Sequence, residues 1–216
     1  MVYHYKKKKN VFEELKLAIM QGIYNPRERL IERTLAAQFG VSRTPVREAV
    51  RKLEAIGMVR IVRNQGAMVA DFTPDEIEAL YLVRMHLEKL AGKLASLNIS
   101  SPGIKTLKAI HQDLIKAAAL GDVSKMVEGD QKFHLTLLGF CRNAYLMRTI
   151  EELRLKSLPI TFCLWKKTKA DVRTSISQHK AMIEALRNKD IEKWNSLVEK
   201  QMNTAKNTYL AFISTR

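Results

Sequence analysis

Phe39-Gly40-Val41-Ser42-Arg43-Thr44-Pro45-Val46-Arg47-Glu48-Ala49-Val50 is the stretch that decides the fold of this chain. Gly40 can adopt a positive φ and so end the helix predicted before it. Ser42 or Thr44 can cap the helix that follows, and either choice leaves Pro45 in the first turn, where its missing N–H costs nothing. The stretch therefore predicts two helices joined by a tight turn.

The second of these helices has an apolar face and a basic face. Val46, Val50 and Leu53 fall on one face at helical spacing. The opposite face carries guanidinium groups near the helix start, which is the end that a recognition helix inserts into the major groove of DNA. A guanidinium can pair with guanine O6 and N7 or with a phosphate. The residues of this exposed face are Arg43, Thr44, Arg47 and Arg51.

A hairpin pattern follows directly. Gly57 ends the helix, and the apolar and β-branched residues 58–62 predict a strand. Asn64-Gln65-Gly66 predicts a turn next to Arg63, and residues 67–72 return as a second strand. A helix-turn-helix followed by such a wing indicates a protein that binds duplex DNA. The alternative interpretation is that the arginines are ordinary solvated charges on a helix.

The charge of the chain agrees with a polyanionic partner. The 216 residues carry a formal net charge of +15. Residues 1–72 hold 14 Lys and Arg against 7 Asp and Glu, which gives them about twice the positive charge density of the remaining residues. The run Lys6 to Lys9 is interpreted either as a solvated tail or as an arm that contacts phosphates and steepens the salt dependence of binding.

The sequence predicts no membrane span. No segment approaches about 20 consecutive apolar residues, and the charged N-terminus lacks the apolar core of a signal peptide. Cys141 and Cys163 are too few for a disulfide framework and are expected to be buried small hydrophobes. A reducing cytoplasm is the expected location.

The pattern changes near Asp71 to Pro74. Thr73 is typical of an N-cap, Pro74 of a first helical residue, and Glu76 completes a capping box. We expect a mainly α protein, with a winged helix-turn-helix domain over 1–72 and an all-α six-helix bundle over 73–216. The helices are expected at about 75–97, 102–120, 123–142, 144–168, 171–188 and 190–213.

Polar side chains interrupt the apolar stripes of these helices. Arg84 lies on the stripe of the first helix, and Asp130 and His134 share a face of the third at i, i+4. His179 and Gln201 lie on the stripes of the fifth and the last helix. A charge buried alone is costly, so these groups must meet one another or a ligand. An Asp and two imidazoles can bind a divalent metal, and an internal Arg can clamp a carboxylate.

In its first third the chain resembles the GntR family of bacterial transcription regulators. The matching text is Leu35-Ala36, Val41-Ser42-Arg43-Thr44-Pro45-Val46-Arg47-Glu48-Ala49, Leu53-Glu54, Gly57-Met58-Val59 and Gly66. The resemblance implies DNA contacts from residues of both helices and from the wing around Gly66. Together with the exposed residues that flank them, the candidate DNA-binding residues are Arg33, Ser42, Arg43, Thr44, Arg47, Arg51, Arg63 and Gly66.

Residues 75–213 resemble the C-terminal effector domain of the FadR-like branch of this family, often called FCD. The match rests on Leu82-Val83-Arg84-Met85-His86-Leu87-Glu88, Asp130-x-x-Phe133-His134, Asn143 and His179. Many members bind a metal through an Asp and three His and respond to small organic acids. The resemblance implies Zn or Ni held by Asp130, His134 and His179. Gln201 stands where the third His is expected, and an amide oxygen is a weaker donor than an imidazole.

Three interpretations of this polar interior stay open. It can hold a metal, with water or Gln201 completing the shell; it can be a metal-free pocket for an anion; or it can be a structural hydrogen-bonded network. Arg84 is either a carboxylate clamp or the partner of Asp130 or Glu88 in a salt bridge. Trp165-Lys166-Lys167 is expected to be a solvated helix end. The candidate effector-binding residues are Arg84, Asp130, His134, Asn143, His179 and Gln201.

These features predict a ligand-responsive transcription regulator, with repression as the commoner mode of the family. We expect a homodimer that binds a pseudo-palindromic operator in double-stranded DNA and responds to a small carboxylate. One alternative is a metal-dependent enzyme, but no clear nucleophile or general base accompanies the Asp and His residues. The other is an architectural DNA-binding protein, which would not need a polar bundle interior.

Overall fold

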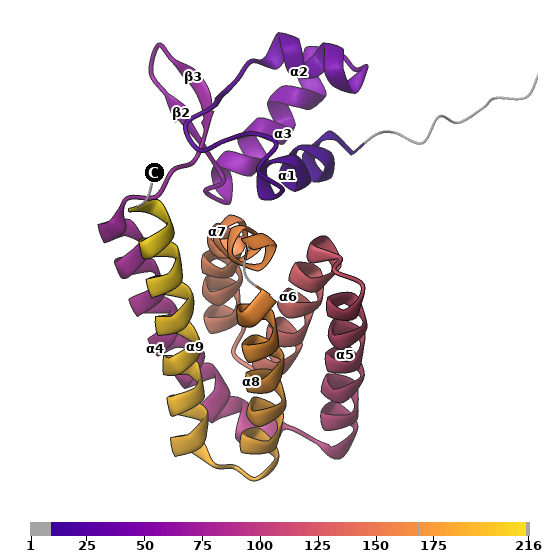
Figure 1. Ribbon diagram of the computed structural model, residues 1–216, viewed down its shortest axis with the longest axis vertical. Coiled ribbons are helices and arrows are strands. Elements are labelled where there is room, and N and C mark those ends of the chain that lie inside the picture. The colour runs from indigo at the N-terminus through magenta and orange to yellow at the C-terminus, as the bar shows by residue number, and fades with distance from the viewer. Residues whose placement is uncertain (1–9, 168, 215–216) are drawn as a thin grey trace, which may run out of the picture. The chain divides into compact units, whose positions relative to one another are not determined.

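The computed structural model describes residues 10–167 and 169–214 of the chain. The chain divides into two compact units, Met1–Asp71 and Phe72–Arg216 (Figure 1). Each unit has its own set of buried apolar residues. The run Lys6 to Lys9 lies outside the described residues. The two units are taken in turn below.

The first unit is a helix-turn-helix with a small antiparallel sheet. The strands stand in the order β1-β3-β2, with Arg29 opposite Met68 and Val59 opposite Val69. Leu15 packs into the same apolar core as residues of the helix-turn-helix. The elements are α1 (Val11–Met20), β1 (Arg29–Leu30), α2 (Glu32–Phe39), α3 (Arg43–Ala55), β2 (Val59–Val62) and β3 (Gly66–Val69).

The turn between α2 and α3 forms for the reason that the sequence indicates. Gly40 caps α2 in the left-handed conformation, with φ of 65°, which a residue without Cβ adopts at little cost. Of the two capping candidates, Ser42 occupies the N-cap position, and its side chain makes no capping hydrogen bond within the part of the chain that the structure describes. The hairpin is confirmed, with Asn64 at a φ of 64° in its turn. Helix α1 and strand β1 complete the unit without having been predicted.

The second unit is all α, and within the described residues it contains six helices. Thr73 and Glu76 form the expected capping box at its start. The helix bounds lie within three residues of those expected, and the largest difference is at α6, which ends before Arg142 adopts a positive φ. The mainly α fold class is therefore confirmed. The helices are α4 (Pro74–Asn98), α5 (Ser101–Ala119), α6 (Val123–Gly139), α7 (Ala144–Lys167), α8 (Lys169–Arg187) and α9 (Ile191–Ile213).

Helices α4 and α9 pack closely along each other (Figure 1). Gly92 of α4 faces the fully buried indole of Trp194 of α9, and a methyl group at residue 92 would overlap that ring. The Trp194 Nε1–H donates to the main-chain oxygen of Glu88 at 3.3 Å. This contact fixes the position of α9 along the axis of α4.

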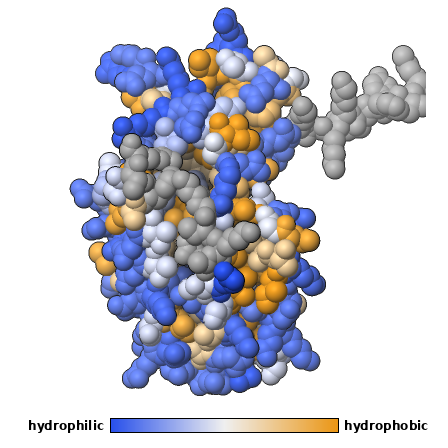
Figure 2. All heavy atoms as spheres, viewed as in Figure 1, coloured by the Kyte–Doolittle hydropathy of each residue, from blue (hydrophilic) through white to orange (hydrophobic). Residues whose placement is uncertain are grey.

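The surface drawn in Figure 2 is mostly hydrophilic in each unit, with apolar side chains in scattered groups. Among the described residues, no helix is both long and apolar enough to cross a lipid bilayer. Cys141 is buried, as expected, and packs at the end of α6. The side chain of Cys163 lies outside the described part of the structure.

Candidate functional sites

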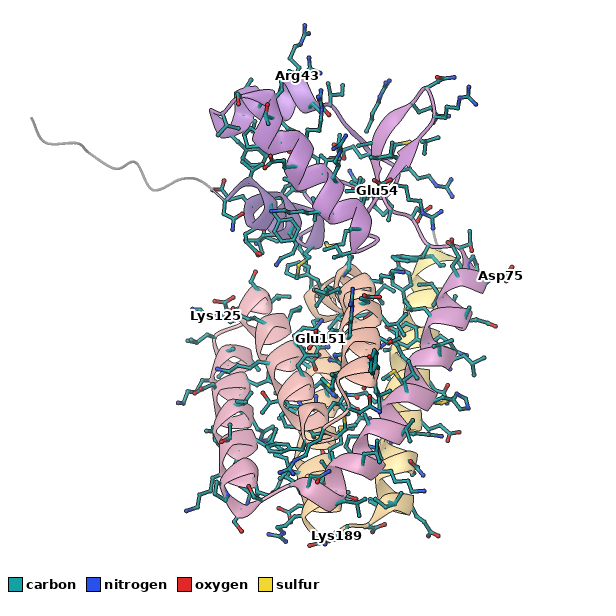
Figure 3. All side chains as sticks on the ribbon, turned by 180° about the vertical axis from the view of Figure 1, so that it is seen from behind. Arg43, Glu54, Asp75, Lys125, Glu151 and Lys189 are labelled. Carbon is teal, nitrogen blue, oxygen red and sulfur yellow. The ribbon has the colours of Figure 1, made fainter. Side chains whose placement is uncertain are left out.

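The exposed arginines of α3 are held by a carboxylate of α2. Glu32 accepts hydrogen bonds from Arg47 Nε at 3.0 Å and from Arg47 Nη2 at 2.9 Å. Its Oε2 also accepts from Arg43 Nη2 at 3.1 Å. The hydrogen bond from Arg47 has the largest influence on the pKa of Glu32 and, with Arg43, lowers it below the ordinary value. We call Glu32, Arg43 and Arg47 the surface fork; Figure 3 labels Arg43 at the start of α3.

The surface fork lies in a hollow that joins the two helices to the wing. Arg33, Arg51 and Gly66, all expected to contact DNA, line it together with the fork. Ser42 and Thr44 are exposed beside it at the start of α3, and Arg63 is exposed at the wing turn. Arg29 also lines the hollow and was not predicted, because the short strand β1 gave no recognisable pattern. The hollow therefore brings together basic side chains from α2, α3 and the sheet.

In the second unit a buried arginine meets a buried carboxylate. Arg84 donates to Glu88 Oε1 from Nε at 3.2 Å and from Nη2 at 2.9 Å. Its Nη1 donates to Ser157 Oγ at 2.7 Å. Burial works against the charge of Arg84, but Glu88, Tyr81 and Asp130 together outweigh that effect and raise the pKa of the guanidinium. Of the two partners considered for Arg84, Asp130 and Glu88, the structure pairs it with Glu88.

A second buried arginine links this pair to the predicted Asp and His residues. Arg154 Nη1 donates to Glu88 Oε1 at 3.2 Å, and Nη2 donates to Asp130 Oδ2 at 3.0 Å. Its Nε donates to Gln131 Oε1 at 2.8 Å. We call Arg84, Glu88, Arg154 and Asp130 the buried ion network; its two guanidinium groups and two carboxylates balance in charge.

Arg154 was missed in the sequence, although a signal for it exists. Ile150, Arg154 and Leu158 follow one another at i, i+4, i+8 on α7 and are all buried. Arg84 was identified because it is a polar residue on the apolar stripe of a helix, and the same criterion identifies Arg154. Trp165 on the same helix was expected in a solvated end, but the structure buries it against the pocket described below.

Asp130, His134 and His179 meet at one point inside the bundle, as their positions on the helix stripes suggested. Asp130 Oδ1 is 3.2 Å from His179 Nε2 and 3.6 Å from His134 Nε2. The two Nε2 atoms are 3.1 Å apart. One ligand atom from each of the three residues can be chosen so that all lie within 4.8 Å of one another. The donors therefore converge as the ligands of a single divalent ion would.

The protonation states at this point suit a metal. Burial alone would raise the pKa of Asp130, but the contacts with His134, His179 and Arg154 outweigh it and hold the pKa well below its usual range. Burial, followed by the charge of Arg154, lowers the pKa of His134 well below its ordinary value. The site thus presents a carboxylate and a neutral imidazole, which are the forms that bind metal.

Gln201 completes this cluster with an amide. Its Nε2 is 3.4 Å from His134 Nε2 and 3.5 Å from His179 Nε2, and its Oε1 is buried with no partner among the described residues. Rotating the amide by half a turn exchanges its oxygen and nitrogen, so the oxygen can face the imidazoles instead. The rings are held by packing, and Phe133 stacks on His179 with centroids 4.2 Å apart. Carboxylate, two imidazoles and an amide oxygen therefore fit a divalent metal.

A pocket opens beside this cluster. Its empty space, including the mouth, is about 690 Å³. Arg84, Asp130, His134 and Gln201 line it, and His179 stands behind them, fully buried. The other lining residues are Tyr81, Gln131, Arg154, Ser157, Thr161, Leu164, Trp165, Thr174, Ser175, Gln178, Met202, Thr204, Ala205 and Thr208.

Asn143 is the one candidate effector residue that the structure does not bring to this group. It is exposed before α7, where its Oδ1 accepts a hydrogen bond from the main-chain N–H of Leu146 at 3.0 Å. Asn at this position satisfies a free N–H of the first helical turn. The structure therefore gives Asn143 the place of a helix cap rather than of a ligand.

The first unit has the winged helix-turn-helix fold of DNA-binding transcription regulators, and comparison with known proteins gives the family. The family model described as "Bacterial regulatory proteins, gntR family" matches residues 7–69, and the model described as "FCD domain" matches residues 79–203. The chain belongs to the GntR family of bacterial transcription regulators and carries an FCD domain, as its sequence motifs indicated.

Individual relatives agree over most of their length. The chain is 30% identical over 184 residues to the uncharacterized HTH-type transcriptional regulator YdhC of Bacillus subtilis (strain 168), covering 84% of this chain and 81% of that protein. It is 29% identical over 185 residues to the gluconate operon transcriptional repressor of the same strain, covering 82% and 74%. The solved structure of E. coli McbR/YncC superposes with a TM-score of 0.79 at 25% identity, covering 94% of this chain and 96% of that one.

Proposed function

We propose that this regulator is a homodimeric repressor whose helical unit senses a small carboxylate through a divalent metal. The observation that carries the proposal is the buried convergence of Asp130, His134 and His179 on the wall of a pocket. A core that served packing alone would not need ionisable groups at this place, because a buried charge is costly unless a partner or a ligand compensates it. Since the target is DNA, the proposed place of action is the cytoplasm.

The charge balance of the pocket favours a metal as the receptor of an anion. In the buried ion network the guanidinium groups of Arg84 and Arg154 already face Glu88 and Asp130. The network therefore has no excess positive charge with which to attract a carboxylate. A Zn²⁺ or Ni²⁺ ion held by Asp130, His134 and His179, with Gln201 Oε1 or water as a further ligand, would supply that charge.

The surface fork and its hollow are the proposed DNA interface. Arg43, Thr44 and Arg47 would read base edges or anchor phosphates, and the wing around Gly66 would contact the backbone or the minor groove. The other proposed contacts are Arg33, Ser42, Arg51 and Arg63. Two protomers would present two copies of α3 to the half-sites of a pseudo-palindromic operator. Differential affinity of the effector for two arrangements of the helical unit would then change operator affinity.

The metal is tested by elemental analysis of the purified protein and by thermal shift with Zn²⁺ or Ni²⁺ after chelator treatment. We expect about one equivalent of metal and a rise in melting temperature on its return, since a ligand of the folded state stabilises it. Asp130→Ala should lose both effects. Asp113→Ala, which removes an exposed carboxylate on α5, is the matched control.

The regulatory role is tested on an operator obtained by selection from random duplexes. Asp130→Ala and His134→Ala should bind this operator as the wild type does but no longer respond to the carboxylate that shifts the wild type. Normal responses of both variants would place the sensor elsewhere. Sedimentation of the protein with and without the operator tests the homodimer.

A metal-free regulator of the same family is the second candidate. It is favoured by Gln201, because an amide oxygen is a weaker donor for Zn or Ni than an imidazole. In that case Arg84 and Arg154 would receive the anion directly after releasing part of the buried ion network. Carboxylate binding that persists in the presence of a chelator would select this candidate.

A further inference from the structure

The wall of the pocket away from the buried ion network has a distinct chemistry. Helix α9 contributes the apolar Met202 and Ala205 to this wall, and five further side chains come from α8 (Thr174, Ser175 and Gln178) and α9 (Thr204 and Thr208). These five side chains are polar but uncharged, and four of the five carry a hydroxyl group. A wall that contacted only the hydrocarbon part of a carboxylate would not need these five polar side chains.

Gln178 gives this wall a buried polar group that lacks a partner. Its relative exposure is 7%, and its Nε2 is buried without a hydrogen-bond partner in the described part of the chain. A buried donor without an acceptor lowers the stability of the fold. Since Gln178 lines the pocket, the acceptor that it lacks can come from a ligand.

The polar side chains of α9 continue this wall away from the cluster of Asp130, His134 and His179. Gln201, Thr204 and Thr208 follow one another at i, i+3, i+7 and therefore share one helix face. At 1.5 Å per residue they span about 10 Å along the helix axis. A ligand gripped at Gln201 by one end would place the rest of its chain beside Thr204 and Thr208.

Hydroxyl groups on the ligand would suit this wall better than methylene groups. A hydroxyl both donates and accepts, so it can bond to a Thr or Ser hydroxyl and accept from an amide N–H. A methylene chain would displace water from the same side chains but could not form hydrogen bonds with them. A site built to bond hydroxyls therefore discriminates strongly against an analogue that lacks them.

We propose that the effector is a polyhydroxy carboxylate, with its acid group at the Asp130–His134–His179 end and its hydroxyls along α8 and α9. Gln178 Nε2 donates to one of these hydroxyls. This inference rests on the proposed function, since it specifies the class of carboxylate that the same pocket binds. Leu164 and Trp165 cover the carbon-bound hydrogens of the ligand chain.

The test compares three matched series of compounds on the full-length protein, by calorimetry in the presence of Ni²⁺. The first series is threonate, xylonate, gluconate and galactonate; the second is butanoate, pentanoate and hexanoate; the third is threitol, xylitol, glucitol and galactitol. We expect at least one acid of the first series to bind about tenfold or more tightly than the alkanoate of equal length and than its own polyol.

The outcomes separate the two proposals. Alkanoates that bind as tightly as every polyhydroxy acid would overturn this inference and leave the carboxylate sensor standing. Polyols that bind as tightly as the acids would also overturn it. If no compound with a carboxylate binds, and none changes operator affinity, the proposed function fails together with the inference.

Variants locate the discrimination on the wall. Gln178→Leu should lose about tenfold in affinity for the best polyhydroxy acid and leave weak alkanoate binding unchanged. Thr204→Val, which keeps the shape of the side chain, provides a second variant if Gln178→Leu folds poorly. Thr149→Val, on the exposed face of α7, is the matched control. Equal loss for both classes of compound in the two wall variants contradicts the assignment.

Discussion

The two units of the chain contain the same chemical motif in opposite surroundings. In the surface fork one carboxylate, Glu32, bonds to two arginines, and in the buried ion network Glu88 does the same. The side chain of Glu32 is 25% exposed and its arginines are more so, whereas the side chain of Glu88 is 1% exposed. Solvent therefore competes with one set of ion pairs and not with the other.

The difference teaches what each arrangement is suited to do. Exposed ion pairs contribute little to stability and are screened by salt, so a phosphate or a guanine can replace Glu32 at small cost. Buried charges lose their hydration on folding, so each member of the buried ion network depends on its partners. The fork is suited to an exchange of partners on binding DNA, and the network to fixing the geometry of a pocket.

The largest effect should come from Glu88→Gln. The change keeps the shape of the side chain but leaves Arg84 and Arg154 with a single carboxylate, Asp130, between them. Removing one member of a buried ion network costs about 3–5 kcal/mol. Denaturant titration monitored by Trp fluorescence should show this loss in the free energy of unfolding of the helical unit. Glu199→Gln breaks the exposed pair with Lys89 and is the control, and an equal result for both variants would refute the contrast.

Arg47→Ala should have the next largest effect, and this effect should be confined to the affinity for DNA. The affinity for a selected operator should fall about tenfold or more if Arg47 makes a bidentate base contact. Fluorescence anisotropy of labelled duplex measures it. Arg148→Ala removes one exposed positive charge from α7 and controls for net charge. Unchanged operator affinity for Arg47→Ala would count against the assigned interface.

A smaller, graded effect is expected from pH in chelator-treated protein. Because burial lowers the pKa of His134 in the folded state, the unfolded chain binds more protons once the pH falls below about 6.5. The stability that a neutral His134 contributes is present above this pH and is lost as the pH falls. The slope from this residue should approach about 1.4 kcal/mol per pH unit. Melting curves of His134→Asn should show a flatter dependence, with His86→Asn, which removes an exposed imidazole, as the comparison.

The smallest effect should come from Glu32→Gln. The change releases Arg43 and Arg47 from the surface fork and removes a negative charge from the hollow that we propose as the DNA interface. Binding to random duplex should therefore tighten, and the ratio of specific to random binding should fall by about twofold to fivefold. Competition titrations at several salt concentrations measure this ratio. A change as large as that of Arg47→Ala would mean that Glu32 does more than position the arginines.

The sequence predicted local features well, because local rules determine them. Gly40 and Pro45 locate the turn and the start of α3, and stripe positions placed Asp130, His134 and His179 inside the bundle. What periodicity does not give is which buried groups on different helices meet. Arg154 joins Glu88 to Asp130 across three helices, and Asn143 shows that a motif residue can serve as a cap outside the pocket. Such contacts depend on the packing of helices far apart in the chain.

The close approach of Gly92 to Trp194 has a mechanical consequence for α9. Sliding α9 along α4 would drive the indole into main chain, so any displacement that preserves the contact must be a tilt about that point. Gln201 lies about 10 Å beyond this fulcrum and Thr208 about 21 Å beyond it. The same small rotation therefore moves Thr208 twice as far as Gln201. A molecule bound along this part of α9 can thus turn a small tilt of the helix into a larger displacement of its C-terminal end.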